Sequence, residues 1–168
     1  MNENGGAFYG KYRGVVTDNN DPLKKGRIRA TVPDVYGAGE SGWAKPAAPF
    51  SGNQMGFFAV PDVHADVWIE FEHGDKDYPI WSGCWWGEES EMSSALDPEH
   101  PKVLIRTKGG HSILLDDEAG GAGITLETSG GQKIVMNDDG IEITNGQGAS
   151  IKLSNNKVSI NGNALEVE

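Results

Sequence analysis

In the first half of the chain, apolar and polar residues alternate over short stretches that are separated by turn-forming residues. Residues 66–72 are the clearest case, because Val67, Ile69 and Phe71 occupy every second position. A period of two is typical of a strand with one buried face. Comparable stretches predict further strands at residues 12–18, 27–32, 43–45, 56–59 and 78–84. No stretch has the 3.6-residue period of a helix, so this half is predicted to be a small β-barrel.

The second half, from residue 103 onward, has a different pattern, in which two apolar residues flank a single residue and the motif then recurs. Successive motifs start 7 to 11 residues apart, and glycine, asparagine and aspartate fill the gaps. Short strands at such steps are typical of a β-structure in which each strand stacks on the next. The motifs are Ile113/Leu115, Ile124/Leu126, Ile134/Met136, Ile141/Ile143, Ile151/Leu153, Val158/Ile160 and Leu165/Val167.

The apolar positions of this second half cannot form a closed core within one chain. Roughly 60 residues of such strands bury too little surface to be stable alone, and they leave bare strand edges. Three copies wound around one axis solve both problems. We therefore predict a homotrimeric needle, a short intertwined triple-stranded β-helix in which lateral strand edges pair between chains. Its predicted core residues are Ile113, Leu115, Ile124, Leu126, Ile134, Met136, Ile141, Ile143, Ile151, Leu153, Val158 and Ile160.

A polar stretch separates the two patterns. Residues 87–102 begin with a run rich in glutamate, and Pro98 and Pro101 are incompatible with a regular strand ladder. The sequence thus predicts an all-β chain with a barrel at residues 1–86, a linker at 87–102 and a trimeric needle at 103–168.

Composition narrows the function classes. The 24 glycines are about twice the usual share of roughly 7%, as expected of a chain that turns often. The formal net charge of −11 opposes binding to a nucleic-acid backbone. No apolar stretch is long enough to predict a membrane span, and the N-terminus lacks the features of a secretory signal. Because Cys84 is the only cysteine, no intrachain disulfide is expected, and synthesis in a reducing bacterial cytoplasm is predicted.

No group of residues predicts a catalytic, metal or cofactor site. The histidines at positions 64, 73, 100 and 111 lack metal-ligand spacing. Acidic runs at residues 116–118 and 138–139 lie near glycines and are interpreted as polar turns, with a calcium site as the alternative. Asp97 and Glu99 lie beside prolines with nothing apolar to raise a pKa, so an acid–base pair is not expected.

Several motifs resemble the spike family of contractile injection systems, which includes phage baseplate spikes, valine-glycine-repeat spikes of type VI secretion and spikes of extracellular injection particles. The motifs are YGKYRGVV at residues 9–16, NDP at 20–22, GRIRATVP at 26–33 and FEHGDKDYPIWSG at 71–83. They resemble the family's oligonucleotide/oligosaccharide-binding (OB) fold, and the second half resembles its triple-stranded β-helix. The resemblance covers about nine-tenths of the chain, and the motifs are specific only in combination.

The resemblance implies a structural spike that transmits contraction force to pierce a target envelope, without an active site or cofactor in this chain. It implies a baseplate hub protein at the barrel, transient contact with the target membrane, and incorporation into a phage tail or a similar particle. The family often covers the end of the needle with a tip protein of the proline-alanine-alanine-arginine (PAAR) type. The predicted docking residues for that protein are Leu165, Glu166, Val167 and Glu168.

The chain departs from the family pattern at three places. Residues 63–66 read VHAD where family members often have Val-Gly-Asp. The linker replaces the lysozyme domain that some phage spikes carry, so no glycosidase activity is expected. No histidine follows His111, so the His-x-His iron apex of some spikes is not expected either.

Two alternatives from other classes stay open. OB folds often stack bases on aromatic side chains, so a single-stranded nucleic-acid module is one alternative, although the acidic charge favours packing at an interface. The residues of that candidate site are Trp81, Trp85, Trp86, Lys24, Lys25, Arg27 and Arg29. A β-helical adhesin or glycan binder is the other, although residues 103–168 contain no Phe, Tyr or Trp. The sequence does not indicate which type of injection system is involved.

Overall fold

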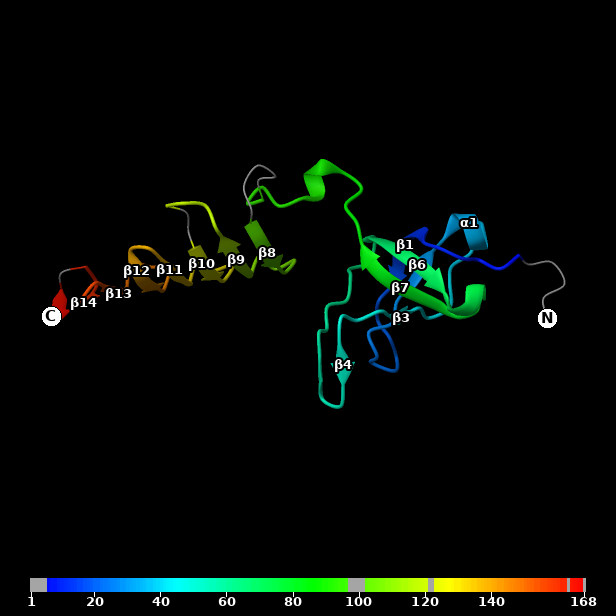
Figure 1. Cartoon of the computed structure of the whole chain (residues 1–168), viewed down its shortest axis with the longest axis horizontal. Coiled ribbons are helices and arrows are strands. Elements are labelled where there is room, and N and C mark those ends of the chain that lie inside the picture. The colour runs from blue at the N-terminus through cyan, green and yellow to red at the C-terminus, as the bar shows by residue number, and fades with distance from the viewer. Residues whose placement is uncertain (1–5, 97–101, 121–122, 163, 168) are drawn as a thin grey trace. The chain divides into compact units, whose positions relative to one another are not determined.

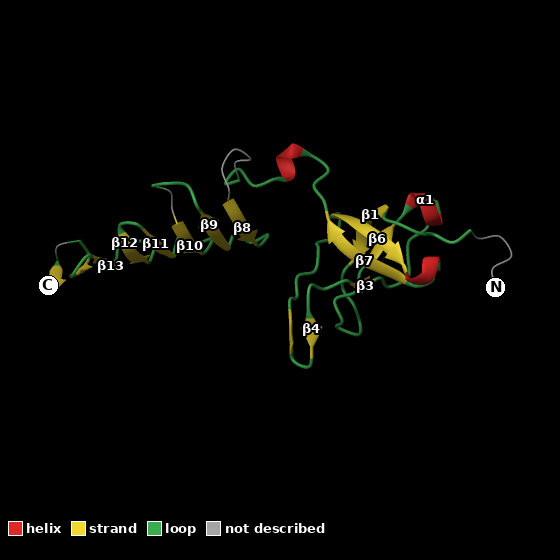
Figure 2. Cartoon of the chain, viewed as in Figure 1, coloured by secondary structure: helices red, strands yellow, loops and turns green. Residues whose placement is uncertain are grey.

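The computed structural model describes residues 6–96, 102–120, 123–162 and 164–167 (Figure 1). The chain divides into two compact units, Met1–Glu91 and Met92–Glu168. Strands dominate both units (Figure 2). Within the predicted linker, Glu89–Glu91 forms a 3-10 turn. Asp97 and Glu99, which the sequence raised as an acid–base pair, lie outside the described residues.

Five strands of the N-terminal unit form one sheet in the order β2-β1-β6-β7-β3. Neighbours are antiparallel except for β3 and β7, which run parallel. A bridge between Ile28 and Ala44 joins the two edges of this sheet, so the sheet closes into a barrel. The strands are β1 (Tyr12–Asp18), β2 (Arg29–Thr31), β3 (Lys45–Pro46), β6 (Asp66–Phe71) and β7 (Pro79–Cys84).

The barrel interior is filled by the alternating residues that the sequence pattern predicts. Val67 and Ile69 of β6 are fully buried and Phe71 is 7% exposed, as expected for one face of a strand. The other fully buried apolar residues are Val16, Ile28, Ala30, Val32 and Ala44. One helical turn, α1 (Pro33–Tyr36), follows β2 and begins with a proline at its first position, where no intrahelical N–H is needed.

The spacing between the NDP and GR motifs has a local structural reason in this chain. The side chain of Asp21 accepts hydrogen bonds from the backbone N–H groups of Leu23, Lys25 and Arg27. It also pairs with the guanidinium of Arg27 at 2.6 Å, and Asp21 is only 8% exposed. One carboxylate therefore organises the whole loop between β1 and β2. The Arg27 guanidinium, together with these N–H groups, holds the pKa of Asp21 well below its usual range.

One predicted barrel strand is wrong. Residues 56–59 do not join the barrel sheet; instead β5 (Met55–Gly56) pairs with β4 (Ser51–Gly52) in a separate two-stranded hairpin. Figure 1 shows this hairpin projecting from the barrel. Every residue from 51 to 59 is exposed, which explains why an apolar stretch at this place does not mark a core strand.

The C-terminal unit is a single sheet of eight strands in chain order, each antiparallel to the next. Pairing of lateral strand edges between chains stays a prediction, whereas within the chain each strand stacks on the next, as the sequence pattern predicts. Short turns make the pairing within the chain local, so its loop-closure cost is small. The strands are β8 (Lys102–Arg106), β9 (Ser112–Asp116), β10 (Gly123–Glu127), β11 (Lys133–Asn137), β12 (Gly140–Thr144), β13 (Ser150–Ser154), β14 (Lys157–Ile160) and β15 (Leu165–Val167).

Two glycines of this sheet are required by close backbone approach. Gly140 starts β12 with a φ of +128°, and a Cβ atom there would lie 2.0 Å from the carbonyl oxygen of Leu153. Gly123 starts β10 with a φ of +60°, and its Cβ would lie 2.2 Å from the oxygen of Met136. No side chain fits at either place, so these glycines allow adjacent strands to pair closely.

Candidate functional site

One face of the C-terminal sheet carries two continuous rows of apolar residues, which we call the apolar face. Every strand contributes one residue to each row, because the strand register places apolar residues opposite apolar residues throughout. The first row is Ile105, Ile113, Leu126, Ile134, Ile143, Ile151, Ile160 and Leu165. The register positions of the second row are Val103, Leu115, Ile124, Met136, Ile141, Leu153, Val158 and Val167.

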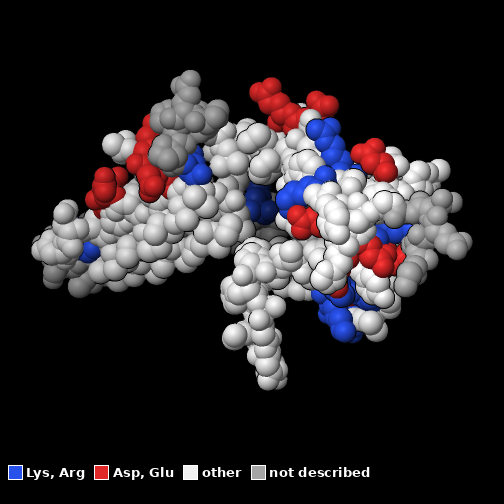
Figure 3. Space-filling model, turned by 45° about the vertical axis from the view of Figure 1, so that its right-hand side comes forward, with Lys and Arg blue, Asp and Glu red and all other residues white. Residues whose placement is uncertain are grey.

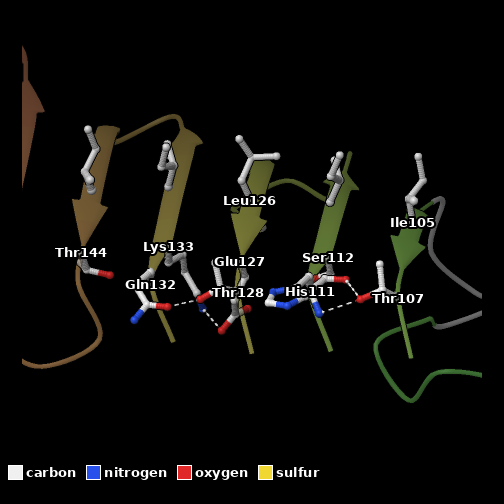
Figure 4. Close-up of a pocket in the computed structure, with 13 residues that line it drawn as sticks. Ile105, Thr107, His111, Ser112, Leu126, Glu127, Thr128, Gln132, Lys133 and Thr144 are labelled. Carbon is white, nitrogen blue, oxygen red and sulfur yellow. Dashed lines mark hydrogen bonds and ion pairs between the residues drawn. The ribbon is translucent and has the colours of Figure 1, made fainter. Parts of the chain in front are cut away.

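The apolar face is not covered within the chain. Ile143, in the middle of the sheet, is 42% exposed, and Leu126 is 38% exposed. In the two outermost strands of the described sheet, Ile105 and Leu165 reach 54% and 53%. Figure 4 shows Ile105 and Leu126 extending to the same side of the sheet, and both line the same hollow. A contiguous apolar surface of this length marks an interaction site.

The opposite face of the sheet is mixed and becomes more polar along the chain. Its central row begins with Leu104 and Leu114, and it continues through Glu142 and Lys152, which are opposite each other in the register. Ion pairs flank this row, with Lys102 3.5 Å from Asp116 and Lys133 3.2 Å from Glu127. In Figure 3 most of the charged side chains over this sheet gather along one border, and most of the rest of its visible surface is uncharged. The two faces therefore differ in composition: one carries only apolar side chains in its two rows, and the other mixes apolar, polar and paired charged side chains.

The five-residue turns at one border of the sheet repeat a single geometry. In each of the turns 107–111, 128–132 and 145–149, the backbone N–H of the first residue donates to the carbonyl of the last. Neighbouring turns also touch, since the N–H of Ser129 donates to Nδ1 of His111 at 3.3 Å. His111 thus acts as a turn histidine, and the repeated turns hold the strands in register.

All twelve residues that the sequence predicted as the needle core lie at register positions of the apolar face. The prediction omitted Val103 and Ile105, which begin the two rows. The signal for them was present, because they have the same spacing, but apolar Leu104 between them obscures the alternation. Leu165 and Val167, which were assigned to tip docking, pair with Ile160 and Val158 and so extend the same rows. Glu166 is opposite Ser159 in the register, and Glu168 lies outside the described residues.

The aromatic and basic residues of the nucleic-acid alternative have separate roles in the barrel. Trp81 donates from its indole N–H to the carbonyl of Gly26. Trp85 stacks on Trp68 at 5.8 Å and lies under the guanidinium of Arg13, whereas Trp86 is 62% exposed. Two of the four cations are already paired, because Arg27 binds Asp21 and Arg29 binds Glu40 at 2.8 Å. The guanidinium groups of these two arginines also lie over the ring of Trp43. These contacts leave little of the predicted patch available to a phosphate backbone.

Acidic and histidine side chains do not assemble into an evident metal centre in the described part of the chain. There, no group of three or more His, Cys, Asp or Glu is arranged to hold a metal ion. Asp116, Asp117 and Asp138 do line one shallow hollow at the border of the sheet. A cluster of carboxylates without a bound ion does not by itself make a calcium site.

Two family models match the chain, and between them they span both units. The model for the "type VI secretion system/phage-baseplate injector OB domain" matches residues 12–86. The model for the "phage baseplate V C-terminal trimerisation domain" matches residues 102–166, which hold almost all of the apolar face. The chain belongs to the phage baseplate V family. The predicted fold class, an OB-fold barrel followed by a trimerising β-domain, is therefore confirmed.

The chain is also similar to several curated proteins, among them three VgrG proteins. The actin cross-linking toxin VgrG1 of Vibrio cholerae is 26% identical over 156 residues, which is 85% of this chain and 14% of that protein. The type VI secretion system spike protein VgrG3 of Vibrio cholerae is 28% identical over 127 residues, 70% of this chain and 12% of that protein. VgrG5 of Pseudomonas aeruginosa, also a type VI spike protein, is 26% identical over 97 residues, 56% of this chain and 11% of that protein. The chain spans only about an eighth of the length of these relatives.

These matches confirm the predicted resemblance to injection-system spikes and support assembly as a homotrimer. They give no support to the nucleic-acid or adhesin alternatives. Among the helices of the described residues, none is long and apolar enough to span a membrane.

Proposed function

We propose that the chain is the structural spike of a contractile injection system and that three copies join their apolar faces around a common axis. The observation that carries this proposal is the pair of apolar rows, each eight register positions long, most of whose side chains one chain leaves exposed to water. Covering these positions would remove on the order of 1,000 Å² of apolar surface per chain, which is in the range of obligate interfaces. The twelve predicted core residues, with Val103 and Ile105, would form the dry interior of this trimer.

Three sheets suit the dimensions of the apolar face. A strand of five residues is about 17 Å long, and only two of its side chains would point toward the axis. Three sheets of such strands can therefore close a triangular prism without leaving a cavity at its centre. Eight strands spaced by about 4.8 Å would give a rod of roughly 35–40 Å. Every strand between β8 and β15 already has both neighbours, so the rod is stiff along its length and exposes few free edges.

The proposed role is mechanical rather than catalytic. Contraction of a sheath elsewhere in the particle would supply force, and the rod would transmit it to the target envelope. VgrG1 of Vibrio cholerae is described as an actin cross-linking toxin, but the chain covers only 14% of that protein, so no such activity is inferred here. The barrel would bind the baseplate hub, in line with its match to an injector OB domain.

A tip protein is proposed at the other end of the chain. β15 is the last strand of the sheet, and one of its two edges has no neighbouring strand in the described residues. Leu165 in this strand is 53% exposed. Removal of residues 165–168 should abolish binding of a PAAR-type tip protein while the spike stays trimeric. Retained tip binding by this shortened trimer would contradict the docking model.

The central test is the mass of the purified chain. Light scattering during gel filtration should give three times the chain mass of 18.0 kDa, and the trimer should persist at nanomolar concentration because the interface is obligate. A folded monomer at that dilution would reject the spike assignment.

A further inference from the structure

The β4–β5 hairpin is the most apolar exposed segment of the barrel unit. Phe50, Met55, Phe57 and Phe58 are 58%, 65%, 52% and 75% exposed, respectively. Met55, Phe57 and Phe58 line, with Trp81 and other residues, a hollow between the hairpin and the barrel. Exposed aromatic side chains gathered on one projecting element mark a contact surface rather than an ordinary loop.

The hairpin is also the longest uncharged segment of a strongly acidic chain. Residues 46–61 contain no Lys, Arg, Asp, Glu or His, whereas the whole chain has 39 Lys, Arg, Asp and Glu residues and a net charge of −11. Figure 3 shows the hairpin as a projection without red or blue side chains. Copies of this chain repel one another on average, so close contact between them is favoured where charge is absent.

The shape of the hairpin argues against insertion into lipid. Its tip is polar, because Asn53 and Gln54 form the turn between β4 and β5, and the aromatic residues lie further back along its arms. An element that enters a membrane tip-first would have to bury these two amide side chains without partners, which is costly. The apolar side of the arms is better suited to a protein surface.

A second copy of this chain is the partner that the trimerisation domain brings close to the hairpin. Trimerisation through the C-terminal domain keeps three barrels in one particle at an effective concentration in the millimolar range. In a three-fold assembly, the hairpin of each chain can contact the barrel of the next chain, and the third chain closes the ring. One type of contact then covers all three hairpins.

We propose that the β4–β5 hairpin packs against the barrel of the neighbouring chain and forms a second trimer contact, distinct from the apolar face. This inference rests on the trimer of the proposed function. It assigns Phe57 and Phe58 to the buried part of that contact, and it leaves Asn53 and Gln54 at its solvated border.

The experiment uses the full chain with the photoreactive residue p-benzoylphenylalanine in place of Phe57. Trimers are assembled from mixed unlabelled and ¹⁵N-labelled chains, so that mass spectrometry separates crosslinks between chains from those within one chain. We expect crosslinks between chains that end on residues 6–86. Crosslinks found only within one chain, or ending on residues 102–167 of a neighbour, would overturn the proposal, as would the absence of any crosslink.

Two charge variants give a matched control. Phe58→Asp should lower the yield of crosslinks between chains about tenfold, because the carboxylate would be buried at the contact. Asn53→Asp adds the same charge at the tip and should leave the yield within about twofold. Equal yields for both variants would contradict the proposal, and so would labelling of lipid from added phosphatidylcholine vesicles in place of protein.

The mass of the irradiated sample distinguishes a failure of the hairpin contact from a failure of the trimeric spike. A monomer by light scattering would reject the proposed trimeric spike. A trimer without crosslinks between barrels would reject only the hairpin contact.

Discussion

The barrel and the C-terminal sheet use similar apolar residues but bury them to very different degrees. In the barrel, Val16, Ile28 and Ile69 are completely buried. In the sheet, Ile113 and Ile151 are 41% and 40% exposed. The barrel closes on itself, so its inward side chains meet those from the opposite wall, whereas the sheet has no second layer. The comparison shows that apolar content does not make a region self-sufficient; a second surface must face it.

The largest effect is expected when a charge is placed on the apolar face. Leu153→Asp would put three carboxylates at the axis of the trimer and should cost several kcal/mol per chain, because buried unpaired charges are strongly destabilising. Ser154→Asp, one residue further along β13, should cost less than about 0.5 kcal/mol because its side chain is on the other face. Light scattering and thermal unfolding measure both variants. If the two behave alike, the sheet does not depend on a partner.

A smaller but still large effect is expected at Gly140. Gly140→Ala should destabilise the sheet by about 3 kcal/mol, because the new methyl group would collide with the carbonyl of Leu153. Gly120→Ala is the control, since Gly120 also has a positive φ of +78° but nothing within 4 Å of its would-be Cβ. That change should cost only about 1 kcal/mol. Urea unfolding followed by far-UV circular dichroism would detect the difference, and equal losses would show that φ alone matters.

An intermediate, pH-dependent effect is expected in the barrel. The pKa of Asp21 is lowered in the folded state, so its stabilisation is present above the unfolded value of about 3.9 and is lost as the pH falls further. Asp21→Asn should lower the urea midpoint at pH 7 and reduce its fall below pH 4. All five tryptophans lie within residues 43–86, so tryptophan fluorescence reports on the barrel alone.

The exposed Asp34 provides the control for this pH dependence. Asp34→Asn should leave the acid-induced fall of the fluorescence midpoint as in the unmodified chain. If Asp21→Asn retains the full fall below pH 4, the hydrogen bonds of Asp21 are not its cause.

The smallest effect is expected at His64, which occupies a left-handed conformation with a φ of +76°. His64→Gly should stabilise the barrel by about 0.5 kcal/mol, because relief of the strained backbone slightly exceeds the added entropy of the unfolded chain. His64→Ala keeps the strain and should bring no gain. Fluorescence-detected urea unfolding would compare the two, and a gain from alanine would assign the effect to the imidazole instead.

The sequence pattern identified most of the fold because its periodicities are local. Alternation predicted β1 and β6, and the spacing of the apolar pairs predicted seven of the eight needle strands, β9 to β15. The hairpin at residues 51–56 was missed because an exposed apolar segment and a core strand have the same composition. The three neighbouring tryptophans were read as one cluster, although Trp81 and Trp85 make contacts with different partners.

By itself, the sequence determined which residues are apolar, how far apart they lie and where the chain must turn, because those properties depend on a few neighbouring positions. Only the tertiary structure decided the register in which the strands of the needle pair, which places Leu165 opposite Ile160. It also decided that Asp21 organises a loop of the barrel. Register and loop geometry depend on which backbone groups meet across the fold, and a linear pattern does not contain that information.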